Sequence, residues 1–91
     1  MHVRKRNLMN TWERRYIKVN YDYEIETSTG VISGAGRCSL DLLEETLHEF
    51  LPTDVAKELL VDYRKHVKAS HGQPFQYTRR TASSRYTVNI G

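Results

Sequence analysis

The sequence has one cysteine, two prolines, no long apolar run and no acidic residue after position 62. A single cysteine excludes a disulfide within the chain, and an unpaired thiol is more typical of a reducing compartment. No window approaches the roughly 18 consecutive apolar residues of a membrane-spanning helix. Polar residues follow the basic N-terminus at once, which argues against a signal peptide. We therefore expect a cytoplasmic protein that makes no contact with a membrane.

Motifs that would indicate catalysis or a cofactor are also missing. Zinc ligands usually come in pairs two to four residues apart, and the available ligands are more scattered; they are Cys38, His48, His66 and His71. The pattern places no histidine to activate Cys38, and the glycines lack the strand-to-helix setting of a phosphate loop. His66 falls at the edge of an apolar helical stripe, which favours a packed neutral side chain. The sequence predicts a noncatalytic protein without metal or cofactor.

What is present is typical of one globular domain. The chain has 91 residues, of which 38% are hydrophobic, 27% are charged and nine are aromatic, which is enough for one hydrophobic core and too little for two. We expect a single domain over residues 11–91, preceded by a basic arm over residues 1–10. Trp12 and Tyr16 stand just before the first predicted strand, where they would cover the edge of the core.

The first part of the chain predicts a β-hairpin. Apolar and polar residues alternate strictly from position 15 to 27, which is typical of a half-buried strand. A turn at positions 28–30 leads into a second strand. Gly34 and Gly36 lie within that strand, and glycines there usually mark a bulge or the end of a strand.

The middle of the chain predicts two consecutive helices. Apolar residues recur at helical spacing from 42 to 50, with Asp41 and Glu44 as a capping box and Ser39 as a rival cap. Pro52 ends this helix at position 51. Thr53 then caps a second helix, which Gly72 would terminate.

A second hairpin is predicted at the C-terminus, with alternation over 75–80 and 86–90 and a turn at 81–84. The order is therefore ββααββ. We expect an α+β fold in which both helices pack on one face of a four-stranded, mainly antiparallel sheet. The strand order does not follow from the pattern.

Charge is segregated along the chain. Residues 1–18 carry a net charge of +5, residues 19–62 carry −8 and residues 63–91 carry +6. Basic ends of this kind would suit a polyanion or an acidic partner. An equally good interpretation is that the basic ends and the acidic middle neutralise each other on folding.

The first functional hypothesis is a binding module for nucleic acid (DNA or RNA) or a nucleoprotein assembly. Arginines grip phosphates and aromatic rings stack on bases, so mixtures of the two are typical of nucleic-acid surfaces. The tyrosines also alternate like core residues, which leaves a structural role open. The candidate contacts are Arg4, Lys5, Arg6, Lys57, Arg64, Lys68, Tyr77, Arg79, Arg80, Arg85 and Tyr86.

The second hypothesis is a protein-binding adaptor or inhibitor, a role that small domains often have in mobile genetic elements. It would use the acidic helix face at Glu44, Glu45 and Glu49, or add a partner strand to an exposed sheet edge. The same edges would permit a homodimer by strand pairing. A helix-turn-helix is disfavoured, because the second helix carries its basic residues late instead of at its N-terminal end.

Overall fold

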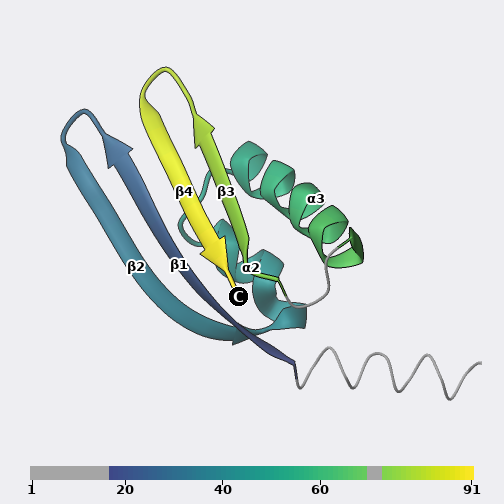
Figure 1. Ribbon diagram of the computed structural model, residues 1–91. Coiled ribbons are helices and arrows are strands. Elements are labelled where there is room, and N and C mark those ends of the chain that lie inside the picture. The colour runs from purple at the N-terminus through teal and green to yellow at the C-terminus, as the bar shows by residue number, and fades with distance from the viewer. Residues whose placement is uncertain (1–16, 70–72) are drawn as a thin grey trace, which may run out of the picture.

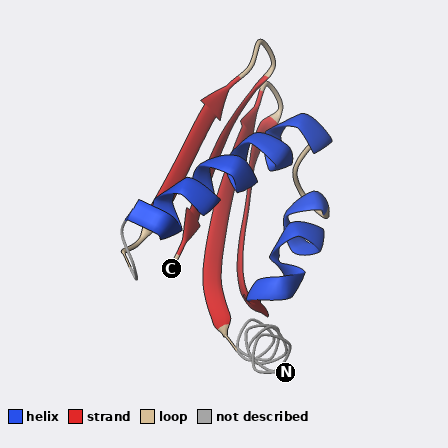
Figure 2. Ribbon diagram, turned by 90° about the vertical axis from the view of Figure 1, so that its right-hand side faces the viewer, coloured by secondary structure: helices blue, strands red, loops and turns tan. Residues whose placement is uncertain are grey.

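The computed structural model describes residues 17–69 and 73–91. Its strands are β1 (Lys18–Thr27), β2 (Gly30–Ser39), β3 (Phe75–Arg80) and β4 (Ser84–Ile90), and its helices are the 3-10 turn η1 (Leu40–Leu42), α2 (Leu43–His48) and α3 (Thr53–Ala69). The four strands form one antiparallel sheet in the order β2-β1-β4-β3 (Figure 1). Figure 2 shows both helices on the same face of that sheet. The predicted ββααββ fold is confirmed.

The pairing of β1 with β4 joins the two hairpins into one sheet. It aligns Tyr21 with Ile90 and Thr27 with Ser84, so both hairpin tips lie at the same end of the sheet (Figure 1). Alternation then gives the sheet a helix face, which α2 and α3 cover, and an open face of mainly polar side chains on the other side. The first and last strands along the chain are therefore neighbours, an arrangement that the sequence pattern left undetermined.

The β1–β2 hairpin has no bulge. Its register runs without interruption from Lys18 opposite Ser39 to Thr27 opposite Gly30, so the expectation of a bulge or a strand end at Gly34 and Gly36 was wrong. Gly30 at the turn has a φ of 148°, a conformation that suits glycine. The two internal glycines serve a different purpose, which involves the tyrosines of the neighbouring strand.

The helix ends differ from the prediction in detail. Ser39 occupies the cap position of η1, but neither η1 nor α2 has a side-chain cap bond, so the predicted capping box at Asp41 is not formed. In α3, the backbone N–H of Ala56 donates to the carbonyl of Pro52 at 2.9 Å. That bond makes Pro52 the capping residue, one position before the predicted Thr53. Gly72, the predicted stop, lies outside the described residues.

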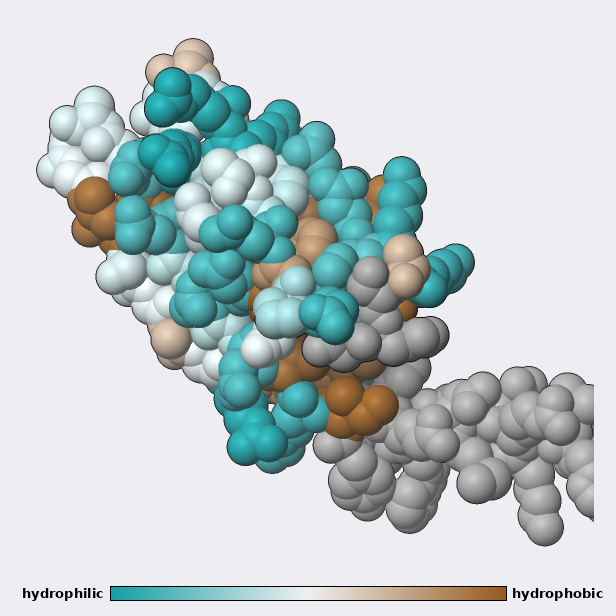
Figure 3. Space-filling view, viewed as in Figure 1, coloured by the Kyte–Doolittle hydropathy of each residue, from teal (hydrophilic) through white to brown (hydrophobic). Residues whose placement is uncertain are grey.

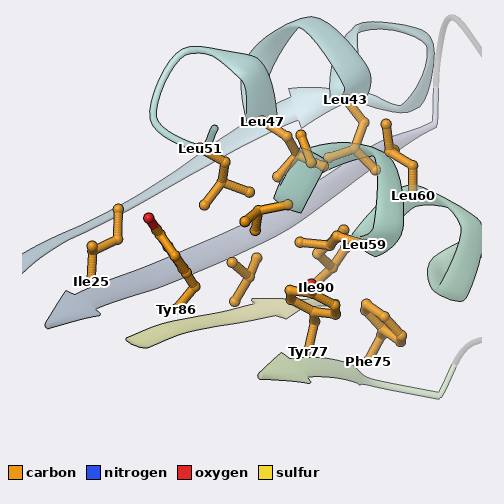
Figure 4. Close-up of a cluster of buried hydrophobic side chains, with 13 residues drawn as sticks. Ile25, Leu43, Leu47, Leu51, Leu59, Leu60, Phe75, Tyr77, Tyr86 and Ile90 are labelled. Atoms are coloured by element: carbon orange, nitrogen blue, oxygen red, sulfur yellow. The ribbon is translucent and has the colours of Figure 1, made fainter. Parts of the chain in front are cut away.

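The core lies between the helix face of the sheet and the two helices (Figure 4). Leu47, Leu59 and Val88 are fully buried, with 0% of each residue exposed. Every strand except β2 contributes at least one buried side chain, and the full set is Ile25, Leu43, Leu47, Leu51, Val55, Ala56, Leu59, Leu60, Phe75, Tyr77, Tyr86, Val88 and Ile90. The strand β2 thus joins the fold mainly through its pairing with β1.

Candidate functional site

Three of the predicted nucleic-acid contacts form a basic stripe on the solvent side of α3. Lys57, Arg64 and Lys68 are exposed, and Val61 among them is 48% exposed. Arg64 lies 3.7 Å from the carboxylate of Glu44 on α2. Both side chains are mostly exposed, so this ion pair adds little stability.

The last hairpin divides its arginines between the two faces of the sheet. Arg79 lies on the helix face, where it contacts Asp54 at 3.5 Å and Glu58 at 3.9 Å. Arg80 and Arg85 lie directly opposite each other on the open face, and Arg85 is 3.8 Å from Glu26. The structure therefore does not bring all the predicted basic contacts onto one surface.

Tyr77 and Tyr86 belong to the core. They are 4% and 9% exposed, so their rings are not accessible for stacking on a base. The hydroxyl of Tyr77 donates a hydrogen bond to Glu58, which also pairs with Arg79. Burial and this hydrogen bond raise the pKa of Tyr77 far above its usual value of 10.0, although Arg79 opposes the shift. The structural role that the alternation had left open is the one observed.

The segregated charges of the sequence meet in the fold. Each ion pair between described residues joins an arginine from the basic C-terminal third to a carboxylate from the acidic middle, and the carboxylates are Glu26, Glu44, Asp54 and Glu58. Mutual neutralisation of the acidic and basic regions is therefore observed at three arginines. The predicted arm residues Arg4, Lys5 and Arg6 lie outside the described residues.

No family model matches the sequence, and no similar curated protein or solved structure was found. The geometry of the fold is therefore the basis for assigning a site. No helix in the described ranges is long and apolar enough to cross a membrane. Nor does the described part of the chain contain a group of three or more histidine, cysteine, aspartate or glutamate residues placed to hold a metal ion.

The histidines and the cysteine have structural surroundings. His66 packs against Phe75, with ring centroids 5.3 Å apart, and its Nε2 lies 2.9 Å from the carbonyl oxygen of Gln73. This agrees with the packed histidine expected at that position. Cys38 is half-buried on β2 and unpaired, while His48 is exposed and His71 lies outside the described residues.

Two of the three acidic residues of the second hypothesis line a groove. Glu44, Glu45 and Glu49 are all exposed, and the first two line a hollow between η1–α2 and the C-terminal half of α3. The groove has a volume of about 420 Å³ and is lined by Leu40, Asp41, Leu43, Glu44, Glu45, Leu60, Tyr63, Arg64, Val67 and Lys68. Its lining combines apolar side chains with charges of both signs.

The outer side of β2 is a second candidate surface, which we call the free edge. β2 pairs with β1 on one side, and within the described residues no strand pairs with its other side. Val31 and Ile32 are 61% and 59% exposed on this strand. Neither was among the candidate contacts from the sequence, which predicted an exposed sheet edge without assigning it to a strand.

Two tyrosines cover the glycines of the free edge. Tyr21 stands opposite Gly36 and Tyr23 opposite Gly34, and their rings lie across β2 over these glycines. Phe50 stacks on the Tyr23 ring, with centroids 3.8 Å apart and planes at 12°. Aromatic side chains are known to compensate for glycines at sheet edges in this way. Once the turn is placed at 28–29, the sequence itself aligns the two glycines with the two tyrosines.

Proposed function

We propose that this protein is a noncatalytic protein-binding module that adds an extended segment of a partner to the free edge of β2. The observation that carries the proposal is a ten-residue edge strand with unbroken pairing and no bulge. Exposed edges of this kind are templates for strand addition. The unpaired cysteine supports a cytoplasmic location for this function.

The usual protections of an edge strand are absent from β2. It contains no proline and a single charged residue, Arg37, whereas natural edges are commonly blunted by proline, lysine, bulges or short length. The opposite edge is better protected, because β3 has only six residues and carries both Arg79 and Arg80. Strand addition is therefore favoured at β2 over β3.

The backbone groups available for pairing follow from the hydrogen-bond alternation. The carbonyl of Asn20 accepts a hydrogen bond from the N–H of Gly91, which follows β4. Asn20 therefore directs its backbone groups toward β4, and the residues that alternate with it along β1 direct theirs toward β2. Antiparallel pairing then turns the N–H groups of Ser33, Ala35 and Arg37 toward the free edge. Those main-chain groups would supply affinity, while neighbouring side chains such as Val31 would supply specificity.

The proposal predicts site-specific crosslinking in the source cell. A photoreactive amino acid at Ala35 should form an adduct with a partner protein, and the Ser33→Pro substitution should abolish it by removing one outward N–H. The matched control is a photoreactive residue at Thr78, whose N–H faces outward on the other edge strand because Thr81 donates to Ser84. It should give no adduct.

Equal adducts at both positions, or none at Ala35, would contradict strand addition at β2. An adduct with twice the mass of the chain would identify a second copy as the partner. In that case the homodimer anticipated from the sheet edges would be the functional form, in place of a different protein.

Nucleic-acid binding is the second candidate, favoured by the arginine pair on the open face. Like charges directly opposite each other on neighbouring strands are destabilising, and Arg80 stands opposite Arg85. Glu26 offsets the charge of Arg85, but Arg80 forms no ion pair within residues 17–69 and 73–91. A bound phosphate would relieve this repulsion, and the mechanism would be phosphate neutralisation.

This candidate predicts saturable binding to short DNA or RNA that weakens steeply with salt. Charge reversal at Arg80 and Arg85 should weaken the binding strongly and reduce the log–log salt slope of the remaining binding by about one for each phosphate that is no longer neutralised. Lys65→Glu, an exposed position on α3 outside the candidate contacts, is the matched control and should leave the affinity nearly unchanged. No binding at low salt, or an equal loss in the control, would rule out the open face as the contact.

A further inference from the structure

The groove between η1–α2 and α3 lacks an occupant in the described chain. Its volume of about 420 Å³ lies within the range of sites that take small ligands or several side chains. Leu43 and Leu60 line it from the buried core, while Val67 on its rim is 38% exposed. Leu42 is 47% exposed, and Ile17, which is hydrogen-bonded to Leu40 nearby, is 46% exposed. Apolar surface is visible at the lower end of the molecule in Figure 3.

The N-terminal segment, residues 1–16, is tethered beside this groove. It joins the described chain at Ile17, whose carbonyl accepts a hydrogen bond of 2.8 Å from the backbone N–H of Leu40. Leu40 itself lines the groove. From Ile17 back to Trp12 is five residues, a span of roughly 8 Å if helical and roughly 17 Å if extended. Trp12 is therefore within roughly 17 Å of Ile17 in either conformation, and Ile17 is bonded to the Leu40 border of the groove.

The chemistry of the segment complements the groove. Leu8, Trp12 and Tyr16 recur every fourth position, a spacing that would place them on one side of a helix. Residues 1–16 also carry five basic residues and a single acidic one. On the groove side, η1 and α2 offer the exposed carboxylates of Asp41 and Glu45. Apolar side chains would fill the floor while the basic residues approach this acidic wall, away from Arg64 and Lys68 on the α3 side of the groove.

We propose that residues 8–16 of the same chain occupy the groove, with the Trp12 side chain as the anchor against Leu60, Tyr63 and Val67. A tryptophan has the largest apolar surface of any side chain and anchors contacts of this type. This proposal is independent of strand addition at β2, because the groove and the free edge involve different elements.

Trp12 is the only tryptophan in the chain, so its fluorescence reports directly on the proposed contact. In the unmodified 91-residue chain we expect a short-wavelength emission and weak quenching by acrylamide. Val67→Asp should shift the emission to longer wavelength and raise the quenching constant by a factor of about two or more, because it places a charge on the apolar rim that Trp12 would contact. The matched control Val61→Asp lies on the same helix outside the groove and should change neither quantity.

Circular dichroism of both variants checks that the fold is retained, and Glu45→Lys provides a second test that leaves the apolar lining intact. It should raise the quenching constant in the same direction as Val67→Asp. Quenching of Trp12 as strong as that of a free tryptophan derivative in the unmodified protein would overturn the proposal. So would shielding that disappears on dilution, because that result would place the segment in the groove of a second copy.

Discussion

Replacing Leu59 with alanine is expected to lower the free energy of unfolding by about 3 kcal/mol, within the range measured for large-to-small changes at fully buried sites. Leu59 is 0% exposed and lies between α3 and the sheet, close to Tyr77 and Ile90 (Figure 4). For a domain of this size the change corresponds to a fall in melting temperature of roughly 12–24 °C. Urea unfolding followed by circular dichroism measures the effect.

The matched control for this prediction is Val61→Ala. Val61 lies two residues further along α3 and is 48% exposed, so its truncation should change the free energy of unfolding by less than about 0.5 kcal/mol. A similar loss in both variants would mean that α3 does not bury the Leu59 side of the helix. The predicted core would then need to be reassigned.

A side chain at Gly34 is expected to destabilise the protein by about 1–3 kcal/mol, the usual cost of overpacking. A Cβ atom built at Gly34 would lie 2.5 Å from the hydroxyl oxygen of Tyr23 and 2.7 Å from the adjacent ring carbon. Tyr23 has little room to yield, because its ring is stacked on Phe50. Gly34→Val should therefore displace the tyrosine and loosen that stack, as chemical denaturation would reveal.

A double-mutant cycle isolates the cause of this effect. In a Tyr23→Ser background the penalty of G34V should largely disappear, giving a coupling of about 1–3 kcal/mol between the two positions. Ala35→Val is the control on the same strand: its side chain lies on the open face, and valine favours strands, so stability should be unchanged or slightly higher. An undiminished penalty in the Tyr23→Ser background would show that the tyrosine is not the obstacle.

The tyrosine–glycine contacts connect stability to the proposed function. They fill the space over two glycines of β2, whose pairing with β1 continues without the bulge that would interrupt the backbone groups of the edge. The edge offered to a partner strand is consequently long and regular. A variant that displaces Tyr23 should weaken partner crosslinking at Ala35 as well as stability.

Much of the fold followed from local pattern. Strict alternation before position 27 and from 75 onward predicts strands, because side chains of a strand point alternately to its two faces. Helical spacing from 42 to 67 and Pro52 between two apolar stripes predict two helices. The histidine at position 66 was correctly expected to pack, since it borders the stripe that contains Tyr63 and Val67.

The helix ends and the glycine-containing strand depended on contacts that a local pattern does not contain. The capping box at Asp41 and Glu44 was plausible from spacing, but the chain enters η1 directly from the end of β2 and the cap bond is not made. The bulge expected at Gly34 and Gly36 was wrong because the rings of Tyr21 and Tyr23 fill the space above them. Cross-strand register decides which side chains meet, and register requires the position of the turn.

The sequence by itself determined the class of fold, the order of its elements and the segregation of charge along the chain, because each depends on residues close to one another. Only the tertiary structure decided where those charges meet. The packing of the helices on one face of the sheet buried Tyr77 and Tyr86 and left Arg79 on that face, while Arg80 lies on the open face. The pairing of β1 with β4 left β2 at the edge of the sheet. A strand flanked on both sides has no free backbone groups, so only an edge strand such as β2 can offer them to a partner.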